Sequence, residues 1–209
     1  MDLLKAYREN PCGTLSIPYW KNKRITVPAH MKIVHDDGYS KSDYMDYGDE
    51  PYFRLYHSLE EIPEADVDDI KIMTAKSTDI PAMVDVINRS YSDLSVTCEQ
   101  LAGYIKTEVF DPDLWIIAVD EKDSDIVGCG IADFDRELRE GILEWIQVLP
   151  DKRGRGIGRV IVCELLKRMK GKADFATVSG KVNNKTAPEK LYRKCGFTGN
   201  DVWHVLKKN

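Results

Sequence analysis

The chain has 209 residues, of which 43% are hydrophobic and 31% are charged, and its formal net charge is −5. A chain of this length can bury a substantial core, so we expect one catalytic domain with an extension. Its apolar runs are much shorter than the roughly 20 residues of a membrane-spanning helix, and the first residues lack the apolar core of a secretory signal. We therefore expect a cytoplasmic protein without a membrane partner.

Five cysteines are spread along the chain: Cys12, Cys98, Cys129, Cys163 and Cys195. Their odd number and wide spacing, without a CxxC pair, argue against a disulfide framework and against a zinc site. The four histidines are scattered and do not have the spacing of metal ligands. We therefore expect reduced, mostly buried thiols and no metal.

The charge is distributed unevenly along the chain. The net charge is −6 over residues 1–69, −9 over residues 70–150 and +10 over residues 151–209. The basic C-terminal part predicts an anionic ligand, and an ordinary solvated surface is the alternative. Nucleic acid is not expected, because the cations are not interleaved with stacking aromatic residues and no nucleic-acid motif accompanies them.

Residues 1–69 contain five prolines and several short runs of β-prone residues. Residues 14–20 and 24–27, separated by three polar residues, predict a hairpin, and residues 31–35 and 52–56 predict further strands. We find no chemical motif in this part of the chain. The sequence therefore predicts a β-rich N-terminal extension of unknown function.

From residue 70 to residue 209, predicted strands and helices alternate. Strands are predicted at residues 69–75, 114–120, 126–134, 142–148, 175–178 and 202–206. Helices are predicted at residues 79–91, 97–107, 156–170 and 186–195, the last with a capping box formed by Thr186 and Glu189. Short turns join the second, third and fourth strands, which predicts an antiparallel meander. The fold class is α+β.

A glycine-rich, basic turn joins a predicted strand to a predicted helix within Val148–Gly158, whose sequence is VLPDKRGRGIG. Glycines let the backbone approach a ligand, and the free amides and dipole at a helix N-terminus favour a negative charge. Arg153, Arg155 and Arg159 would add mobile countercharge. This arrangement predicts a pyrophosphate site.

Two other phosphate-binding motifs fit this segment less well. A P-loop needs Lys-Ser or Lys-Thr after its last glycine, and neither follows here. A dinucleotide fingerprint needs GxGxxG and an acidic residue about 20 positions later, whereas the glycines fall as GxGxG and residues 176–178 are Ala, Thr and Val. An ordinary glycine-rich loop is the remaining alternative.

Residues 70–209 resemble the GNAT superfamily of N-acetyltransferases. Three segments carry the resemblance, in the expected order: Glu144–Gln147, Val148–Gly158 with the pattern Arg-x-x-Gly-x-Gly, and Leu191–Phe197. The resemblance implies a GNAT-type fold, in which helices flank a mixed, mostly antiparallel central sheet. It also implies transfer of an acetyl group from acetyl-CoA to an amine.

The resemblance also implies where the cofactor binds. Pantetheine would pair with the backbone of Ile146 and Val148, where their strand splays from the next. The pyrophosphate would lie against one continuous set of residues: Arg153, Gly154, Arg155, Gly156, Ile157, Gly158 and Arg159. Family members commonly have an asparagine seven residues before the tyrosine of the last motif, a place that Lys185 takes here. Asn184 is the neighbouring residue that we assign to CoA.

Two residues are candidates for proton transfer. The resemblance places Tyr192 near the thioester sulfur, where a phenol can protonate the departing thiolate. Glu144 alternates with the inward side of its strand and can accept the amine proton, directly or through water. The alternatives are a core tyrosine and a surface carboxylate paired with lysine. No cysteine has a suitable place for an acyl-enzyme, so we expect direct transfer in a ternary complex.

The sequence thus predicts an acyl-CoA-dependent N-acetyltransferase that acts on a small-molecule or peptide amine, and it is compatible with a homodimer. A catalytically silent acyl-CoA-binding sensor or interaction module is the second hypothesis. The acidic middle region further predicts a preference for cationic acceptors, through four carboxylates: Asp93, Glu99, Asp133 and Asp135. The identity of the acceptor does not follow from the fold.

Overall fold

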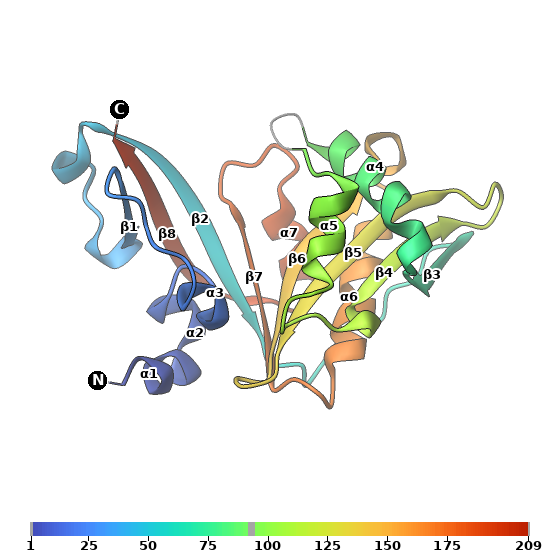
Figure 1. The fold of residues 1–209 in the computed structure, drawn as a ribbon, viewed down its shortest axis with the longest axis horizontal. Coiled ribbons are helices and arrows are strands. Elements are labelled where there is room, and N and C mark those ends of the chain that lie inside the picture. Colours follow the sequence, from blue (N-terminus) through green and yellow to red (C-terminus); the bar gives the residue numbers. More distant parts are fainter. Residues whose placement is uncertain (1, 92–94, 209) are drawn as a thin grey trace. The chain divides into compact units, whose positions relative to one another are not determined.

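The computed structural model describes residues 2–91 and 95–208, which form an α+β fold (Figure 1). The chain divides into two compact units. The first comprises the described residues of Met1–His57, Thr177–Arg193 and Phe197–Asn209, and the second comprises those of Ser58–Ala176 and Lys194–Gly196. The first unit joins segments that are distant in sequence, because the end of the chain pairs with its beginning, and the predicted boundary between residues 69 and 70 stays a prediction. Within the described residues, no helix is long and apolar enough to cross a membrane.

Four strands form the first unit, in the order β1-β8-β2-β7. They are β1 (Met31–His35), β2 (Tyr47–His57), β7 (Phe175–Lys181) and β8 (Thr198–Lys208). Strand β8 is antiparallel to both β1 and β2, with Ile33 and Glu50 each opposite Val205. The strands predicted at residues 31–35, 52–56 and 202–206 are confirmed, although β2 and β8 are longer than predicted.

The hairpin predicted at residues 14–20 and 24–27 is wrong. Short helices are found in this part of the first unit: α1 (Leu3–Glu9), α2 (Pro11–Thr14) and α3 (Tyr19–Asn22). The side chain of Asn10 accepts a hydrogen bond from the Gly13 amide, and Pro11 occupies the first position of α2. These capping features start a helical turn, and the β-prone runs beside them are too short to override it. The N-terminal part is therefore less β-rich than predicted.

The second unit is built on an antiparallel meander, as the sequence predicts. Its strands are β3 (Ile70–Thr74), β4 (Trp115–Asp120), β5 (Ile126–Asp135) and β6 (Glu140–Val148), in the order β6-β5-β4-β3. Its α-helices are α4 (Ile80–Ser90), α5 (Cys98–Tyr104) and α6 (Ile157–Met169). Helix α7 (Pro188–Lys194), farther along the chain, belongs to the first unit except for its last residue. The predicted order of elements from residue 70 onward is confirmed.

Short 3-10 turns connect these elements. They are η1 (Asp36–Gly38), η2 (Lys41–Tyr44), η3 (Ser77–Asp79), η4 (Pro112–Leu114) and η5 (Pro150–Lys152). Helix α5 begins with a capping box between Thr97 and Gln100 and ends at Tyr104, before the predicted end at residue 107. The two reciprocal hydrogen bonds of the capping box thus fix the start of α5, whereas the apolar periodicity of the sequence does not locate its end.

Helices cover both faces of the second unit's strands, with α4 and α5 on one face and α6 on the other (Figure 1). Alternation along β5 separates the two faces. Cys129 and Ile131 join the apolar cluster beneath α4, whereas Gly130 faces α6. A Cβ atom on Gly130 would lie 2.5 Å from Cγ2 of Ile161. Glycine at this position therefore lets α6 pack directly on the strand.

The capping box predicted at Thr186 and Glu189 does not describe the start of α7, which begins at Pro188. The amide and hydroxyl of Thr186 both donate to Oδ1 of Asn184, at 2.9 and 2.8 Å. The carboxylate of Glu189 accepts a hydrogen bond from Nε of Arg193 at 2.9 Å. Local bonding by Asn184 competes with the predicted cap, because asparagine side chains readily close a turn two residues on.

Candidate functional site

The glycine-rich turn lies between the end of β6 at Val148 and the start of α6 at Ile157. Its backbone has positive φ angles at Gly154 (81°) and Gly156 (92°), which other residues rarely adopt. A Cβ atom on Gly156 would also lie 3.1 Å from Cγ2 of Val67. Conformation and space thus both require glycine at residue 156.

The turn leads directly into the first amides of helix α6. Helix α6 has 13 residues, and its N-cap is Gly156, which has no side chain to satisfy the first amides. The first amides of an α-helix have no carbonyl partner within the helix, and the helix dipole adds partial positive charge there. Residues 153–156 are exposed. An anionic group such as a pyrophosphate suits a helix N-terminus of this kind, and the predicted pyrophosphate site stays a prediction.

The side chain of Arg153 is held by backbone carbonyls of the second unit. Its Nε donates to the Val148 carbonyl oxygen at 3.0 Å, and its Nη2 donates to the Ser90 carbonyl oxygen at 3.3 Å. Arg153 therefore links the C-terminal end of α4 to the end of β6. This contact differs from the mobile countercharge that the sequence predicts.

Arg155 and Arg159 are also engaged with protein acceptors. Nη1 of Arg155 lies 3.4 Å from Oδ2 of Asp120, and Nη2 of Arg159 donates to the Glu64 carbonyl oxygen at 3.0 Å. Both acceptors lie far from the turn in sequence, so the sequence pattern does not reveal these contacts. The role of the two arginines as countercharge for a phosphate stays a prediction.

The carbonyl oxygen of Val148 accepts a hydrogen bond from Nε of Arg153 at 3.0 Å, and the Ser90 hydroxyl lies 3.3 Å from it. That hydroxyl has a single hydrogen, and its nearer acceptor is the Val86 carbonyl oxygen at 2.7 Å. Arg153 is therefore the donor that a pantetheine amide meets at this oxygen. Sequence reasoning missed Ser90, and its position near the end of α4 gives no signal of this contact.

Glu144 sits at a β-bulge of β6. Ile131 lies opposite Trp145, but the next residue, Ala132, lies opposite Leu143, so Glu144 is an extra residue on its strand. Its side chain is half-buried. Bulges bend a strand and redirect side chains, and they are common beside active sites. The predicted regular alternation is thus interrupted at Glu144, which the sequence pattern does not reveal.

Polar and aromatic side chains follow the bulge along β6. The ring of Trp145 makes an edge contact with Tyr91, with ring centroids 6.0 Å apart. Nε2 of Gln147 donates to the Tyr91 hydroxyl at 2.7 Å. Ile146, the predicted pantetheine partner, lies between these two residues and opposite Gly130. Its side chain is half-buried.

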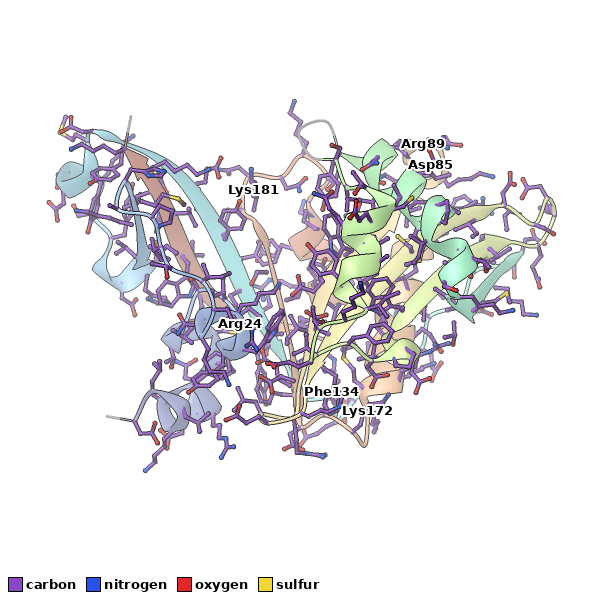
Figure 2. The ribbon with its side chains drawn as sticks, in the orientation of Figure 1. Arg24, Asp85, Arg89, Phe134, Lys172 and Lys181 are labelled. Atoms are coloured by element: carbon purple, nitrogen blue, oxygen red, sulfur yellow. The ribbon has the colours of Figure 1, made fainter. Side chains whose placement is uncertain are left out.

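A hollow of about 480 Å³ lies near the turn within the second unit. It is lined by Ala82, Asp85, Arg89, Ser124, Asp125, Ile126, Val127, Leu149, Asp151 and Lys152. Arg89 and Asp85, neighbours on α4 (Figure 2), lie 3.3 Å apart, and Arg89 is 3.8 Å from Asp151. Because its charges of both signs are already paired, this hollow offers no purely cationic site for a phosphate.

Tyr192 belongs to the first unit and lies on α7. Its ring is buried, with centroids 6.2 Å from Phe53 and 5.8 Å from Phe197. These ring contacts explain why the ring of Tyr192 is buried. The role of its hydroxyl as a proton donor stays a prediction. Asn184, in the same unit, uses its Oδ1 atom to hold the turn before α7. That contact is a local structural role for the residue that we assigned to CoA.

Two of the four carboxylates predicted to border an acceptor cleft are buried instead, Asp133 and Asp135. Oδ1 of Asp135 accepts hydrogen bonds from the amides of Glu137 and Leu138 at 2.9 and 3.2 Å, so it closes the β5–β6 turn. The prediction is therefore wrong for Asp135, because a carboxylate at a strand end satisfies turn amides. Glu99 is exposed on α5. Asp93 lies outside the described residues.

The thiols follow the prediction of reduced, mostly buried cysteines. Cys98 is exposed, the other four are buried, and none of the five cysteines forms a disulfide. Burial raises the pKa of Cys129 to about 12, so its reactive thiolate is strongly disfavoured. Among residues 2–91 and 95–208, no group of three His, Cys, Asp or Glu side chains is arranged to hold a metal ion.

Residues 111–199 match the model of the acetyltransferase (GNAT) domain family. A comparison with curated protein sequences gave no match. Among solved structures, the chain is similar to a GCN5-related N-acetyltransferase from Sphaerobacter thermophilus, with a TM-score of 0.71 and 19% identity over 90% of this chain and 63% of that one. The chain thus spans less than two thirds of that structure.

Two further solved structures have related folds, and their names give two different acceptors. A glucosamine N-acetyltransferase region of a fungal multi-domain β-N-acetylglucosaminidase has a TM-score of 0.59 and 15% identity, over 77% of this chain and 21% of that one. The ribosomal-protein-S18-alanine N-acetyltransferase from Escherichia coli has a TM-score of 0.53 and 18% identity, over 66% of this chain and 91% of that one. At these identities the likeness shows the fold alone.

Proposed function

We propose that this chain, whose residues 111–199 belong to the GNAT acetyltransferase family, is an acyl-CoA-dependent N-acyltransferase that transfers an acetyl group from acetyl-CoA to a primary amine. One observation carries the proposal: the family match covers the turn between β6 and α6, in which Gly154 and Gly156 have positive φ angles and Gly156 is the N-cap of α6. A helix N-terminus of this kind suits the pyrophosphate of CoA.

Within the second unit, the residues that hold CoA are assigned as follows. The amides of Gly154–Gly158 bind the pyrophosphate, and the backbone at Ile146 and Val148 pairs with pantetheine. Arg155 and Arg159 supply positive charge nearby, although both also bond to the protein. Bound acetyl-CoA supplies a thioester, which is an acyl group already activated for attack.

Glu144 is assigned as the proton acceptor. An amine attacks only as the neutral form, and it loses a proton as its nitrogen bonds to the acetyl carbon. Glu144 accepts that proton directly or through one water. Its place at a bulge supports the assignment, because an extra residue in a strand points its side chain away from the regular pleat.

Tyr192 of the first unit is assigned as the proton donor to the sulfur that leaves when the carbon–sulfur bond breaks. The family resemblance of Leu191–Phe197 supports this role. Transfer is direct, without an acyl-enzyme. The burial of Cys12, Cys129, Cys163 and Cys195 favours this route, because an acyl-enzyme needs an accessible thiolate.

The acceptor is a small-molecule or peptide amine. Of the solved structures with this fold, one is named for acetylation of glucosamine and another for acetylation of a ribosomal-protein alanine. The fold therefore does not select between small-molecule and protein amines. The acidic charge of residues 70–150 favours amines with a second positive charge, with a preference that declines as salt screens it.

The proposal is tested by incubating the purified chain with acetyl-CoA and a panel of amines while free thiol is measured. We expect amine-dependent release of CoA. Release of CoA without an amine, with the acetyl label kept on the protein, would contradict direct transfer. Tight CoA binding without turnover on any amine would instead favour a catalytically silent acyl-CoA-binding module.

A further inference from the structure

A buried carboxylate lies behind the phosphate-binding turn. Asp120, the last residue of β4, is only 3% exposed. Its Oδ1 accepts a hydrogen bond from the Lys122 amide at 3.3 Å, and its Oδ2 lies 3.3 Å from Nζ of Lys152 and 3.4 Å from Nη1 of Arg155. A buried charge is costly unless it is paired, and both oxygens here have partners.

The two cationic partners of Asp120 belong to the turn itself. Lys152 ends η5, and Arg155 directly precedes the N-cap glycine of α6. Between them the backbone passes through Gly154, which has a φ of 81° and nothing within 4 Å of a Cβ position. The turn has little packing of its own at that point. A single oxygen that binds side chains on both sides of Gly154 therefore restrains its path.

We propose that Asp120 is a positioning residue for CoA: by holding Lys152 and Arg155, it fixes the turn in the arrangement that binds the pyrophosphate. The inference rests on the proposed function, because it concerns the same turn. Asp120 itself is buried on the protein side of these cations, so we assign it no contact with substrate.

Simple charge considerations predict the opposite effect. Asp120 offsets one of the two positive charges beside the pyrophosphate site, and removing it would leave a more cationic turn. A more positive surface attracts an anion more strongly. The sign of the change in CoA affinity therefore separates positioning from charge compensation.

The ion pairs of Asp120 with Lys152 and Arg155 persist over the ordinary pH range. The Lys122 amide, followed by Lys152 and Arg155, holds the pKa of Asp120 below its ordinary value of 3.8. A carboxyl group with a lowered pKa stays ionised at neutral pH, and its interactions are lost only as the pH falls through that lower value. The turn is therefore held at every pH at which an acyltransferase assay is practical.

The test is the affinity of Asp120→Asn for CoA, measured by calorimetry at low and high salt. Positioning predicts an affinity about ten-fold lower, a higher KM for acetyl-CoA and an unchanged kcat at saturation. Asp123→Asn is the matched control, because Asp123 is exposed and lies 4.0 Å from Lys152. It makes the same change of charge and should leave the affinity within about two-fold of the wild type.

An affinity equal to or above that of the wild type in a folded Asp120→Asn variant overturns the inference. If that variant does not fold, Lys152→Met tests the same ion pair. It removes the cation of the partly exposed Lys152 and leaves the buried carboxylate of Asp120 in place. Positioning predicts a higher KM for acetyl-CoA that 0.5 M salt does not remove, whereas a loss of charge alone fades with salt. Failure of the wild type to bind CoA would instead overturn the proposed function.

Discussion

Arg153 donates a hydrogen bond from Nε to the carbonyl oxygen of Val148 over 3.0 Å, and this bond links the turn before α6 back to the last residue of β6. The same guanidinium also bonds to the carbonyl oxygen of Ser90 at the end of α4. One side chain therefore joins a strand end, a helix end and the glycine-rich turn.

Arg153→Ala should weaken CoA binding by about 1–3 kcal/mol, the usual cost of losing a charged hydrogen-bond partner. The loss should appear in the KM for acetyl-CoA more than in kcat, because Val148 and Ser90 lose their common partner. Arg139→Ala is the control, since Arg139 forms an exposed pair with Asp174 at 2.8 Å. Unchanged CoA affinity in Arg153→Ala would contradict this role.

Gly158→Glu should abolish CoA binding and leave the chain folded. The new carboxylate lies in the first turn of α6, where its charge repels a pyrophosphate. Gly103→Glu is the matched control, because a Cβ atom at Gly103 has nothing within 4 Å. Calorimetry with CoA and circular dichroism of both variants test the prediction. A folded Gly158→Glu variant that binds CoA normally would remove the central assignment.

Glu144→Gln should lower kcat by about 10²-fold while the affinity for CoA stays the same, since general base catalysis is typically of this size. The substitution keeps the shape of the side chain at the bulge of β6. Glu121→Gln, an exposed position in the turn after β4, serves as the control. If kcat is unchanged, Glu144 has a structural role only.

Tyr192→Phe should lower kcat by about 10²-fold or more, with little change in CoA affinity. Phenylalanine preserves the ring contacts with Phe53 and Phe197 and removes only the hydroxyl. Tyr104→Phe, on an exposed side chain of α5, is the control. Wild-type turnover in Tyr192→Phe would mean that this tyrosine serves the packing alone.

Native protein should react with N-ethylmaleimide at one thiol, that of Cys98, and at all five thiols after unfolding. Cys98 is the exposed cysteine, whereas burial raises the pKa of Cys129 to about 12. Cys98→Ser should remove the native reaction and retain acyltransferase activity, as direct transfer requires. Loss of activity in Cys98→Ser would point to an acyl-enzyme. Mass spectrometry of labelled peptides identifies the modified residue.

Local sequence determined most of the second unit. Strand-like runs separated by turn residues predict β4, β5 and β6, and apolar periodicity predicts α4 and α6. The spacing of Gly154, Gly156 and Gly158 locates the turn between strand and helix. These features depend on near neighbours in the chain, so one sequence is enough to read them. The same local signal carries the resemblance to the GNAT family, whose model matches residues 111–199 and so covers that turn.

Tertiary structure decided the rest. The β-prone run predicted at residues 14–20 ends in helical turns instead: Asn10 and Pro11 start α2, and Pro18 directly precedes α3, which contains Trp20. The bulge at Glu144 follows from the register of β5 on β6. Arg155 has its partner in Asp120, 35 residues earlier in the chain. Register and long-range ion pairs depend on which segments meet in space, and no local pattern of residues records that.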